Sequence, residues 1–153
     1  MIKIRTAQES DLLIVSQWLR NQTECEMWAG HRVLYPIDLP DLPDAIQWSE
    51  SDSWVVTLRE EVAAFGQLVP KPGGRFHLAR LIVAPDHRAE GLGRRLTEHL
   101  LATAVGTEAS VLSLNVFADN YRAIALYHSL GFSEADRPAD EPESLAVYMT
   151  YAV

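Results

Sequence analysis

The stretch that decides the fold runs from residue 78 to residue 96 and reads LARLIVAPDHRAEGLGRRL. Its apolar run, residues 81–83, stops at Ala84-Pro85. A polar turn follows and contains Gly91 and Gly93, after which apolar residues recur at helical spacing. This order predicts a buried strand, a glycine-bearing turn and an amphipathic helix.

The predicted turn has the properties of an anion site. The start of a helix presents unpaired backbone N–H groups and a partial positive charge, which together can hold an anion such as a pyrophosphate. Gly91 and Gly93 would let the backbone curl and approach a ligand closely. Two common phosphate motifs do not fit, because position 96 is Leu rather than the third Gly of a dinucleotide fingerprint, and no Lys follows Gly93.

Apolar periodicity and turn residues predict mixed α and β structure along the rest of the chain. Residues 54–83 read as an antiparallel meander of three strands with a strong turn at 70–74. Residues 21–44 carry Gly30 and three prolines and predict a loop. The remaining predicted elements are a first strand at 2–5, a helix at 11–19, a short helix at 44–49, a helix from Gly93 to Gly106, a strand at 111–117, a helix from Asn120 to Gly131, and strands at 132–135 and 145–151.

The bulk composition indicates one soluble globular domain. With 153 residues, 48% hydrophobic and 22% charged, the chain has the size and balance of a single domain over residues 1–153. No window approaches the ~20 apolar residues of a membrane span, and the charged first ten residues do not fit a signal peptide. Cys25 is the only cysteine, so no internal disulfide can form. We therefore expect a cytoplasmic protein without a membrane partner.

The distribution of charge is more informative than its sum. The formal net charge of −8 argues against nucleic acid as a partner, because such binding relies on basic patches. Five arginines fall within residues 75–95, whereas carboxylates gather in residues 24–52 and 134–143. The basic region would favour an anionic cofactor and the acidic regions a cationic substrate. The simpler interpretation of any individual carboxylate is a solvated loop charge.

Two motifs carry a family resemblance. Arg88-x-x-Gly91-x-Gly93 resembles the acyl-CoA signature [QR]-x-x-G-x-[GA] of the GNAT superfamily of N-acetyltransferases. The segment 120–132 resembles the second motif of that superfamily, N-x-x-A-x-x-L-Y-x-x-x-G-F, with Tyr127 at the tyrosine position. The two motifs span residues 78–132, and the predicted order of elements is similar to the family's over nearly the whole chain.

The resemblance implies an α+β fold of three layers, α/β/α, in which a mixed central sheet splays between the strands at 75–83 and 111–117. Acetyl-CoA would lie in that split as a co-substrate, with backbone groups of the first strand pairing with its pantetheine and the turn holding its pyrophosphate. The amine substrate would enter from the opposite side, bordered by residues 20–50 and 134–144. The cofactor-binding residues so implied are Leu81, Ile82, Val83, Arg88, Ala89, Glu90, Gly91, Leu92, Gly93, Arg94 and Asn120.

The implied chemistry is direct transfer of an acetyl group to a primary amine of a small molecule or peptide. A backbone N–H such as that of Val83 would stabilise the oxyanion, and the hydroxyl of Tyr127 would protonate the departing thiolate as general acid. The general base that deprotonates the amine has several candidates. In one branch of the family a Glu lies five residues before the motif Asn, but this position is Asn115 here. His77 is then a candidate base, and Glu24, Glu26 or a water relay are alternatives.

Four further expectations complete the interpretation. A rival hypothesis is a catalytically inactive acyl-CoA-binding sensor or interaction module, which the missing carboxylate at position 115 favours and Tyr127 opposes. No His or Cys grouping indicates a metal site. The resemblance also suggests a homodimer, formed through the apolar C-terminal strand. Trp28 and Tyr35 would either contact a cationic substrate or pack in the core.

Overall fold

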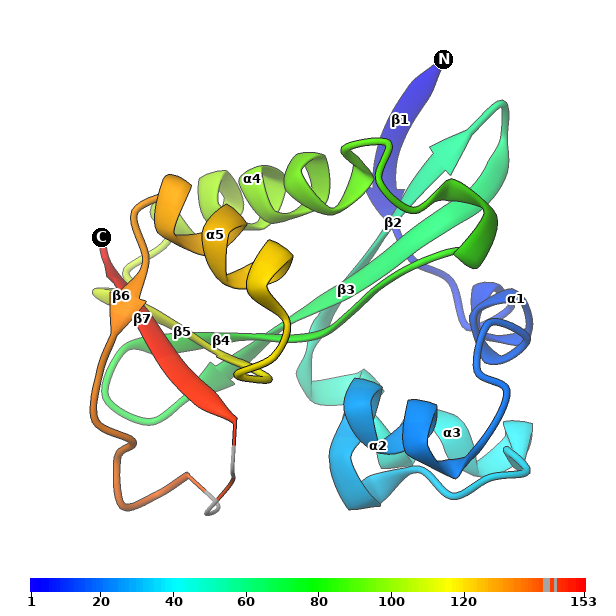
Figure 1. The fold of residues 1–153 in the computed structure, drawn as a ribbon, viewed down its shortest axis with the longest axis horizontal. Coiled ribbons are helices and arrows are strands. Elements are labelled where there is room, and N and C mark those ends of the chain that lie inside the picture. Colours follow the sequence, from blue (N-terminus) through cyan, green and yellow to red (C-terminus); the bar gives the residue numbers. More distant parts are fainter. Residues whose placement is uncertain (142–143, 145) are drawn as a thin grey trace.

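A seven-stranded mixed sheet forms the middle layer of the molecule, with helices on both faces (Figure 1). The computed structural model describes residues 1–141, 144 and 146–153. The strands are β1 (Ile2–Thr6), β2 (Asp52–Leu58), β3 (Glu61–Lys71), β4 (Arg75–Val83), β5 (Val111–Val116), β6 (Ser133–Glu134) and β7 (Val147–Ala152). The α-helices are α1 (Asp11–Ser16), α2 (Gln22–Ala29), α3 (Leu42–Ala45), α4 (Leu92–Val105) and α5 (Tyr121–Ser129). The layered α+β fold expected from the resemblance is therefore confirmed.

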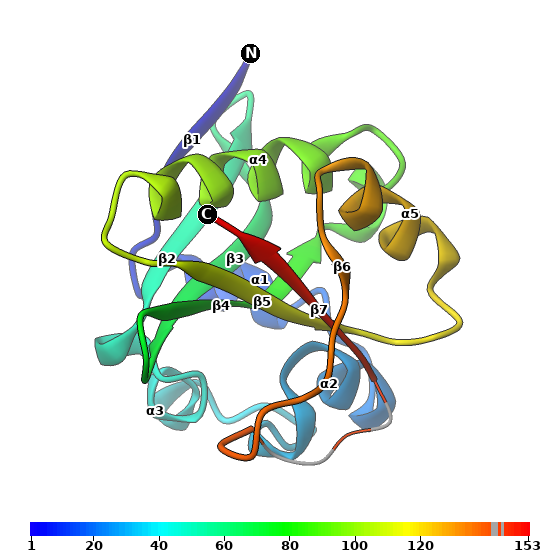
Figure 2. The same ribbon diagram turned by 90° about the vertical axis from the view of Figure 1, so that its left-hand side faces the viewer.

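The sheet order is β1-β2-β3-β4-β5-β7-β6, and every neighbouring pair is antiparallel except β4 and β5. The strands β2, β3 and β4 form the meander that the sequence predicts. A parallel pair needs a crossover connection, and here α4 supplies it between β4 and β5. Figure 2 shows α4 lying across the face of the sheet between these strands.

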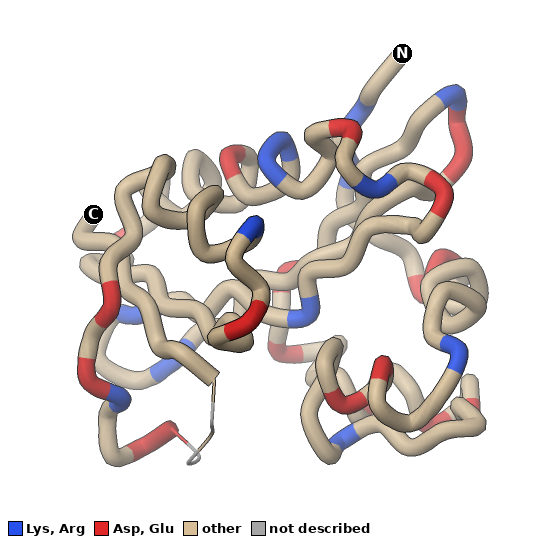
Figure 3. Tube along the Cα trace, in the orientation of Figure 1, with Lys and Arg blue, Asp and Glu red and all other residues tan. Residues whose placement is uncertain are grey.

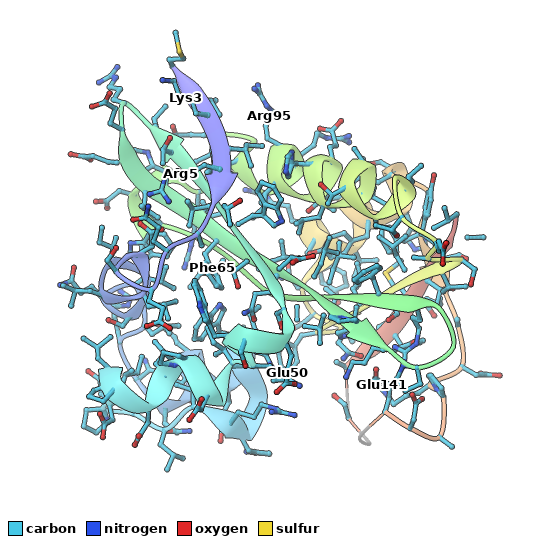
Figure 4. All side chains as sticks on the ribbon, turned by 180° about the vertical axis from the view of Figure 1, so that it is seen from behind. Lys3, Arg5, Glu50, Phe65, Arg95 and Glu141 are labelled. Atoms are coloured by element: carbon cyan, nitrogen blue, oxygen red, sulfur yellow. The ribbon has the colours of Figure 1, made fainter. Side chains whose placement is uncertain are left out.

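Each face of the sheet has its own apolar core. On one face, the stripe Leu92, Leu96 and Leu100 of α4 packs with Leu112 and Tyr127. On the other face, α1, α2 and α3 pack against the N-terminal half of the sheet around the fully buried Phe65 (Figure 4). Figure 1 shows α2 and α3 below the N-terminal half of the sheet, while the segment after β6 runs below the C-terminal half. That C-terminal half carries polar side chains that belong to the candidate site.

The main correction to the predicted fold is the helix α2, because residues 21–44 were expected to form a loop. Asn21 caps this helix by accepting a hydrogen bond from the Glu24 N–H at 2.9 Å, and Gly30 ends it. Only Cys25 and Trp28 of the helix are buried, so its apolar periodicity is weak. The capping pair Asn21 and Glu24 was the sequence signal for this helix.

Other predicted boundaries shift by a few residues. The first helix ends at Ser16 rather than Leu19, and the short helix expected at 44–49 is the single turn α3 followed by a 3₁₀ turn, Trp48–Glu50. The helix after the glycine turn begins at Leu92, one residue before Gly93. The predicted strand at 132–135 is reduced to β6, and the part of the predicted strand 145–151 at Leu145 lies outside the described residues.

The last strand, β7, is not at the edge of the sheet. It pairs with β5 along its whole length and with β6 at Met149 and Thr150. Strands of the same chain thus pair with β7 on both of its sides. Among the described helices, none is long and apolar enough to cross a membrane.

The homodimer through the C-terminal strand stays a prediction. Light scattering of the purified chain should give twice the mass of one chain. A monomer mass that persists at high protein concentration would contradict it.

Candidate active site

The site begins where β4 and β5 separate. The two strands pair in parallel from Arg75 with Val111 to Leu78 with Leu114, and no pairing continues beyond that point. β4 nevertheless runs on to Val83 and β5 to Val116. The sheet therefore opens into a wedge between these strand ends, which confirms the splayed sheet that the family resemblance implies.

The bend of β4 has an identifiable local cause. Arg80 adopts a left-handed backbone conformation, with φ of 54°, at a bulge where the register between β3 and β4 shifts. Its carbonyl turns toward α2 and accepts a hydrogen bond from the Trp28 indole N–H at 2.8 Å. Trp28 also packs against Phe65. Of its two expected roles, Trp28 thus has the core-packing one, while Tyr35 is exposed.

Past the bulge, backbone groups of β4 face the split. The Ala84 N–H donates to the Ala63 carbonyl at 2.8 Å, and Ile82 lies opposite Phe65, so Ile82 and Ala84 point their backbone groups at β3. By alternation, Leu81 and Val83 point theirs the other way. The Val83 carbonyl accordingly accepts a hydrogen bond from the Arg88 Nε–H at 3.3 Å. Of the three predicted strand residues, Leu81 and Val83 are thus placed to pair with a ligand, and Ile82 is not.

The turn after β4 forms a concave run of backbone N–H groups. Ala89 and Gly91 both have left-handed backbones, with φ of 64° and 83°, and Gly91 is the residue before α4. The Arg95 N–H already bonds to the Gly91 carbonyl, which leaves the N–H groups of residues 92–94 at the helix start for a ligand. Alternating backbone conformations of this kind make anion-binding concavities.

The surroundings of this turn suit a phosphate. The side chains of Arg88, Glu90 and Arg94 are exposed, whereas Leu92 is buried beneath them. Nothing lies within 4 Å of a Cβ built on Gly91, so the space above the turn is open. Gly93 lies inside α4 and leaves room beside Val83. The residues predicted to hold pyrophosphate are therefore gathered in one place.

The second motif supplies the opposite wall of the split. Asn120 uses its side chain to cap α5, accepting a hydrogen bond from the Ala123 N–H at 3.2 Å, and it thereby fixes the turn before this helix. Tyr127 is buried in the same cluster as Leu92 and Val116, which stand at the two sides of the split. Burial raises the pKa of the Tyr127 hydroxyl to about 12, so it stays protonated at neutral pH.

His77 belongs to a polar network on the face of the sheet that is turned away from α4 and α5. Its Nδ1 lies 2.7 Å from the Ser113 Oγ, and its Nε2 lies 3.4 Å from the Asn115 Nδ2. The Asn115 Oδ1 is fixed by the Arg137 guanidinium at 2.6 Å, so the amide must present its N–H₂ to His77. The His77 Nε2 is then the acceptor and Nδ1 carries the proton, which describes a neutral imidazole.

Charged residues next to His77 are themselves paired. The Arg75 guanidinium donates to the Glu141 carboxylate at 2.7 Å and to Asp140 at 3.2 Å, and the Lys71 ammonium lies 3.7 Å from Glu141. Burial opposes ionisation of Glu141, but the Arg75 hydrogen bond and the neighbouring cations hold its pKa below the usual range. Burial lowers the pKa of His77 to about 4.

Sequence reasoning missed most of this network. Ser113, Asn115, Arg137 and Glu141 approach residues that are 22 to 66 positions away in the chain, and no spacing rule connects them. The alternative bases are placed elsewhere. Glu24 is half-buried and paired with Arg20, and Glu26 lies beside His31. Within the described part of the chain, no group of three or more His, Cys, Asp or Glu side chains could hold a metal ion.

Unfolding at different pH values tests the state of His77. The unfolded imidazole titrates near ~6.5, while the folded one has a pKa of about 4, so between these values the unfolded chain binds a proton that the folded chain does not. His77 therefore stabilises the fold above pH ~6.5, and this contribution is lost as the pH falls toward 4. Over this pH range, we expect the unfolding free energy of His77→Gln to fall by about 2–3 kcal/mol less than that of the wild type.

Chemical denaturation at several pH values gives the comparison. His31→Gln is the matched control, because the His31 side chain is 94% exposed. Parallel pH curves for the wild type and His77→Gln would contradict the buried neutral imidazole.

Comparison with known proteins agrees with this geometry. The model of the acetyltransferase (GNAT) family matches residues 15–132. The chain is 38% identical over 103 residues to the [ribosomal protein bS18]-alanine N-acetyltransferase of Escherichia coli strain K12, a match that spans 60% of this chain and 68% of the relative. It is 34% identical over 89 residues to the peptidyl-lysine N-acetyltransferase YjaB of Salmonella typhimurium, which spans 58% of this chain and 54% of that relative.

Solved structures give the same result. The crystal structure of the ribosomal-protein-S18-alanine N-acetyltransferase from E. coli superposes with a TM-score of 0.75 at 28% identity, covering 99% of this chain and 94% of that one. The PaiA N-acetyltransferase of Thermoplasma acidophilum, solved with coenzyme A, shares the fold with a TM-score of 0.76 at 17% identity, covering 100% and 99%. The chain therefore belongs to the acetyltransferase (GNAT) family and is an acetyl-CoA-dependent N-acetyltransferase.

Proposed function

We propose that this enzyme transfers the acetyl group directly from acetyl-CoA to a primary amine of a small molecule or peptide, with Tyr127 as general acid. The observation that supports the proposal is the environment of Tyr127, a protonated and buried tyrosine of α5 in the same apolar core as Leu92 of α4 and Val116 at the end of β5. The wedge between β4 and β5 would receive the pantetheine, and the concave turn before α4 would hold the pyrophosphate.

In the reaction the amine nitrogen forms a bond to the acetyl carbon, and the carbon–sulfur bond breaks. A backbone N–H at the free edge of β4, such as that of Val83, would stabilise the oxyanion of the tetrahedral intermediate. The departing sulfur takes the electron pair of the broken bond, and the Tyr127 O–H donates to it. Because the pKa of Tyr127 is about 12, the hydroxyl remains protonated until negative charge develops on sulfur.

The amine must lose protons to become a neutral nucleophile and then an amide. The His77 Nε2 is unprotonated but already accepts from Asn115, and a pKa of about 4 makes it a weak base. We propose that His77 acts mainly by positioning Asn115 beside the split, while a water relay removes the proton. A direct role of His77 as base would require the Asn115 amide to move aside.

The names of two relatives suggest the chemical class of the acceptor. The E. coli relative is named for an alanine of a ribosomal protein and the Salmonella relative for peptidyl-lysine, which are both peptide amines. The substrate would enter on the face of the sheet that carries His77, Arg80 and Asn115, which we call the acceptor face. An inactive acyl-CoA sensor remains the second candidate, since position 115 lacks a carboxylate.

Replacing Gly91 tests the cofactor turn. Gly91→Val should abolish acetyl-CoA binding, because a β-branched residue does not adopt φ of 83° and its side chain would project into the open space above the turn. Titration calorimetry of the wild type should show one acetyl-CoA per chain with a dissociation constant of ~1 μM–1 mM. Gly73→Val, which strains a remote turn with φ of 81°, is the control. Normal affinity in Gly91→Val would place the pyrophosphate elsewhere.

Replacing Tyr127 tests the proton donor. Tyr127→Phe should lower kcat by roughly 10²–10⁴-fold and leave the KM for acetyl-CoA nearly unchanged, because the hydroxyl acts mainly in the transition state. Thiol release with a panel of amines is the assay, and Tyr121→Phe, at a 78% exposed tyrosine, is the control. An unchanged kcat when chemistry limits the rate would remove Tyr127 from the mechanism. Acetyl-CoA binding without turnover of any amine would favour the sensor.

A further inference from the structure

Arg80 is a cation on the acceptor face that has no carboxylate partner among the described residues. Its Nη1 donates to the Ile46 carbonyl at 3.0 Å and to the Gln67 Oε1 at 2.8 Å, and its Nη2 donates to the Gln47 Oε1 at 3.0 Å. All three acceptors are neutral oxygens. A guanidinium has five N–H donors, so the Nε–H and one Nη2–H have no acceptor in the described part of the chain.

The Arg80 guanidinium is partly removed from water without an ionic partner among the described residues. The side chain is largely buried, and burial lowers the pKa of Arg80 to about 10. The neighbouring charge that adds to this shift is another cation, Arg32. Buried charges are ordinarily paired, because neutral oxygens only partly replace the lost hydration. The free N–H edge of this partly exposed guanidinium, which has no carboxylate partner in the described part of the chain, is therefore suited to bind an anion.

The carboxylates nearby do not supply that anion. Glu141 and Asp140 bind Arg75, with Lys71 beside them, so two cations already face two carboxylates. Glu24 binds Arg20 and Glu26 faces His31. Figure 3 shows acidic and basic residues interspersed along the chain rather than one acidic face. The sequence-based expectation that acidic regions select a cationic substrate thus has no support in these pairings.

The position of Arg80 relates its free N–H edge to the reaction. Leu78 is the last residue of β4 paired with β5, so the Arg80 backbone lies just beyond the start of the split. Its guanidinium lies against Gln67 of β3 and residues 46–47 after α3. Its charge also acts on the buried His77, which contacts Asn115 on the other side of the split. A second guanidinium, that of Arg137, lies against Asn115 and over the Tyr148 ring. Two guanidinium groups, those of Arg80 and Arg137, thus belong to the acceptor face.

We propose that the acceptor amine of this enzyme carries a carboxylate, and that the free Nε–H and Nη2–H edge of Arg80 binds it. Arg is suited to this task because its planar fork matches the two oxygens of a carboxylate. The same cations disfavour an ammonium at the reacting position, which helps to present the amine in its neutral, nucleophilic form. This inference rests on the proposed transfer reaction.

Matched acceptors that differ only in one negative charge test the proposal. The pairs are β-alanine with β-alaninamide, and the tripeptide amides Ala-Glu-Ala with Ala-Gln-Ala. We expect kcat/KM to be at least tenfold higher for the acid of a pair. Preference for β-alanine indicates a small amino acid, and preference for the glutamyl peptide indicates an acidic peptide. Equal rates for acids and amides would overturn the proposal.

Variants of Arg80 assign that preference to the residue. Arg80→Met should lower kcat/KM for the acids by roughly ten- to a hundredfold more than for the amides. Arg59→Met, on the β2–β3 turn, is the matched control and should change neither. An equal loss for acids and amides in Arg80→Met would overturn the assignment. The affinity for acetyl-CoA shows that the variant is folded, and Arg80→Lys provides a charged alternative if it is not.

A binding measurement separates this inference from the transfer reaction. If no amine is acetylated, the proposed reaction fails, and the anion site is then tested with glutarate as the probe. Glutarate should raise the Tm of the wild type and of Arg59→Met in the presence of coenzyme A, compared with sodium chloride at equal ionic strength, but not the Tm of Arg80→Met. The absence of a rise in the wild type would overturn the anion site.

Discussion

The separation of β4 from β5 is the constraint on which the rest of the structure depends. Two strands that pair through Leu78 and Leu114 and then diverge leave backbone groups without partners, and an unpaired backbone group is costly in a protein interior. A ligand that adds amides between the strands can satisfy these groups. The separation thus creates both the binding surface and the energetic reason for using it.

Several features hold this separation in place. The left-handed backbone of Arg80 carries a conformational cost of the order of 1–2 kcal/mol for a residue with a side chain. The Trp28 indole that bonds to its carbonyl is fixed in turn by Phe65 and the second core. On the opposite face, α4 and α5 pack as one layer, so the glycine turn and Tyr127 move with the same core. The bend in one strand therefore orients the anion-binding turn, the free strand edge and the buried hydroxyl together.

The arginines of the sheet have two kinds of partner: Arg75 binds carboxylates, whereas Arg80 and Arg137 bind neutral groups. The Glu141 carboxylate accepts a hydrogen bond from the Arg75 guanidinium. Arg75 also donates to the Ser113 Oγ, which in turn contacts the His77 Nδ1. Arg80 and Arg137, by contrast, bind neutral groups on the acceptor face. The overall charge of −8 gave no indication of this local arrangement.

The sequence predicted the local part of the site well and its long-range part poorly. Gly91 and Tyr127 belong to motifs whose spacing is fixed by one turn and one helix, and the structure has Gly91 immediately before α4 and Tyr127 buried on α5. The contacts of His77, Asn115 and Arg137 depend on register between strands distant in sequence, which periodicity does not encode. The helix α2 was missed for a related reason, because only Cys25 and Trp28 form its apolar face, although the Asn21 cap was visible.

Backbone hydrogen exchange, measured with and without acetyl-CoA, tests the central claim most directly. If the co-substrate completes the split sheet, the amides of Leu81, Val83 and residues 92–94 should exchange much more slowly when acetyl-CoA is bound, while the amide of Ile82, which faces β3, should change little. Binding that leaves Leu81 and Val83 unprotected would contradict the account, because the free edge of β4 would then not be the surface that holds the ligand.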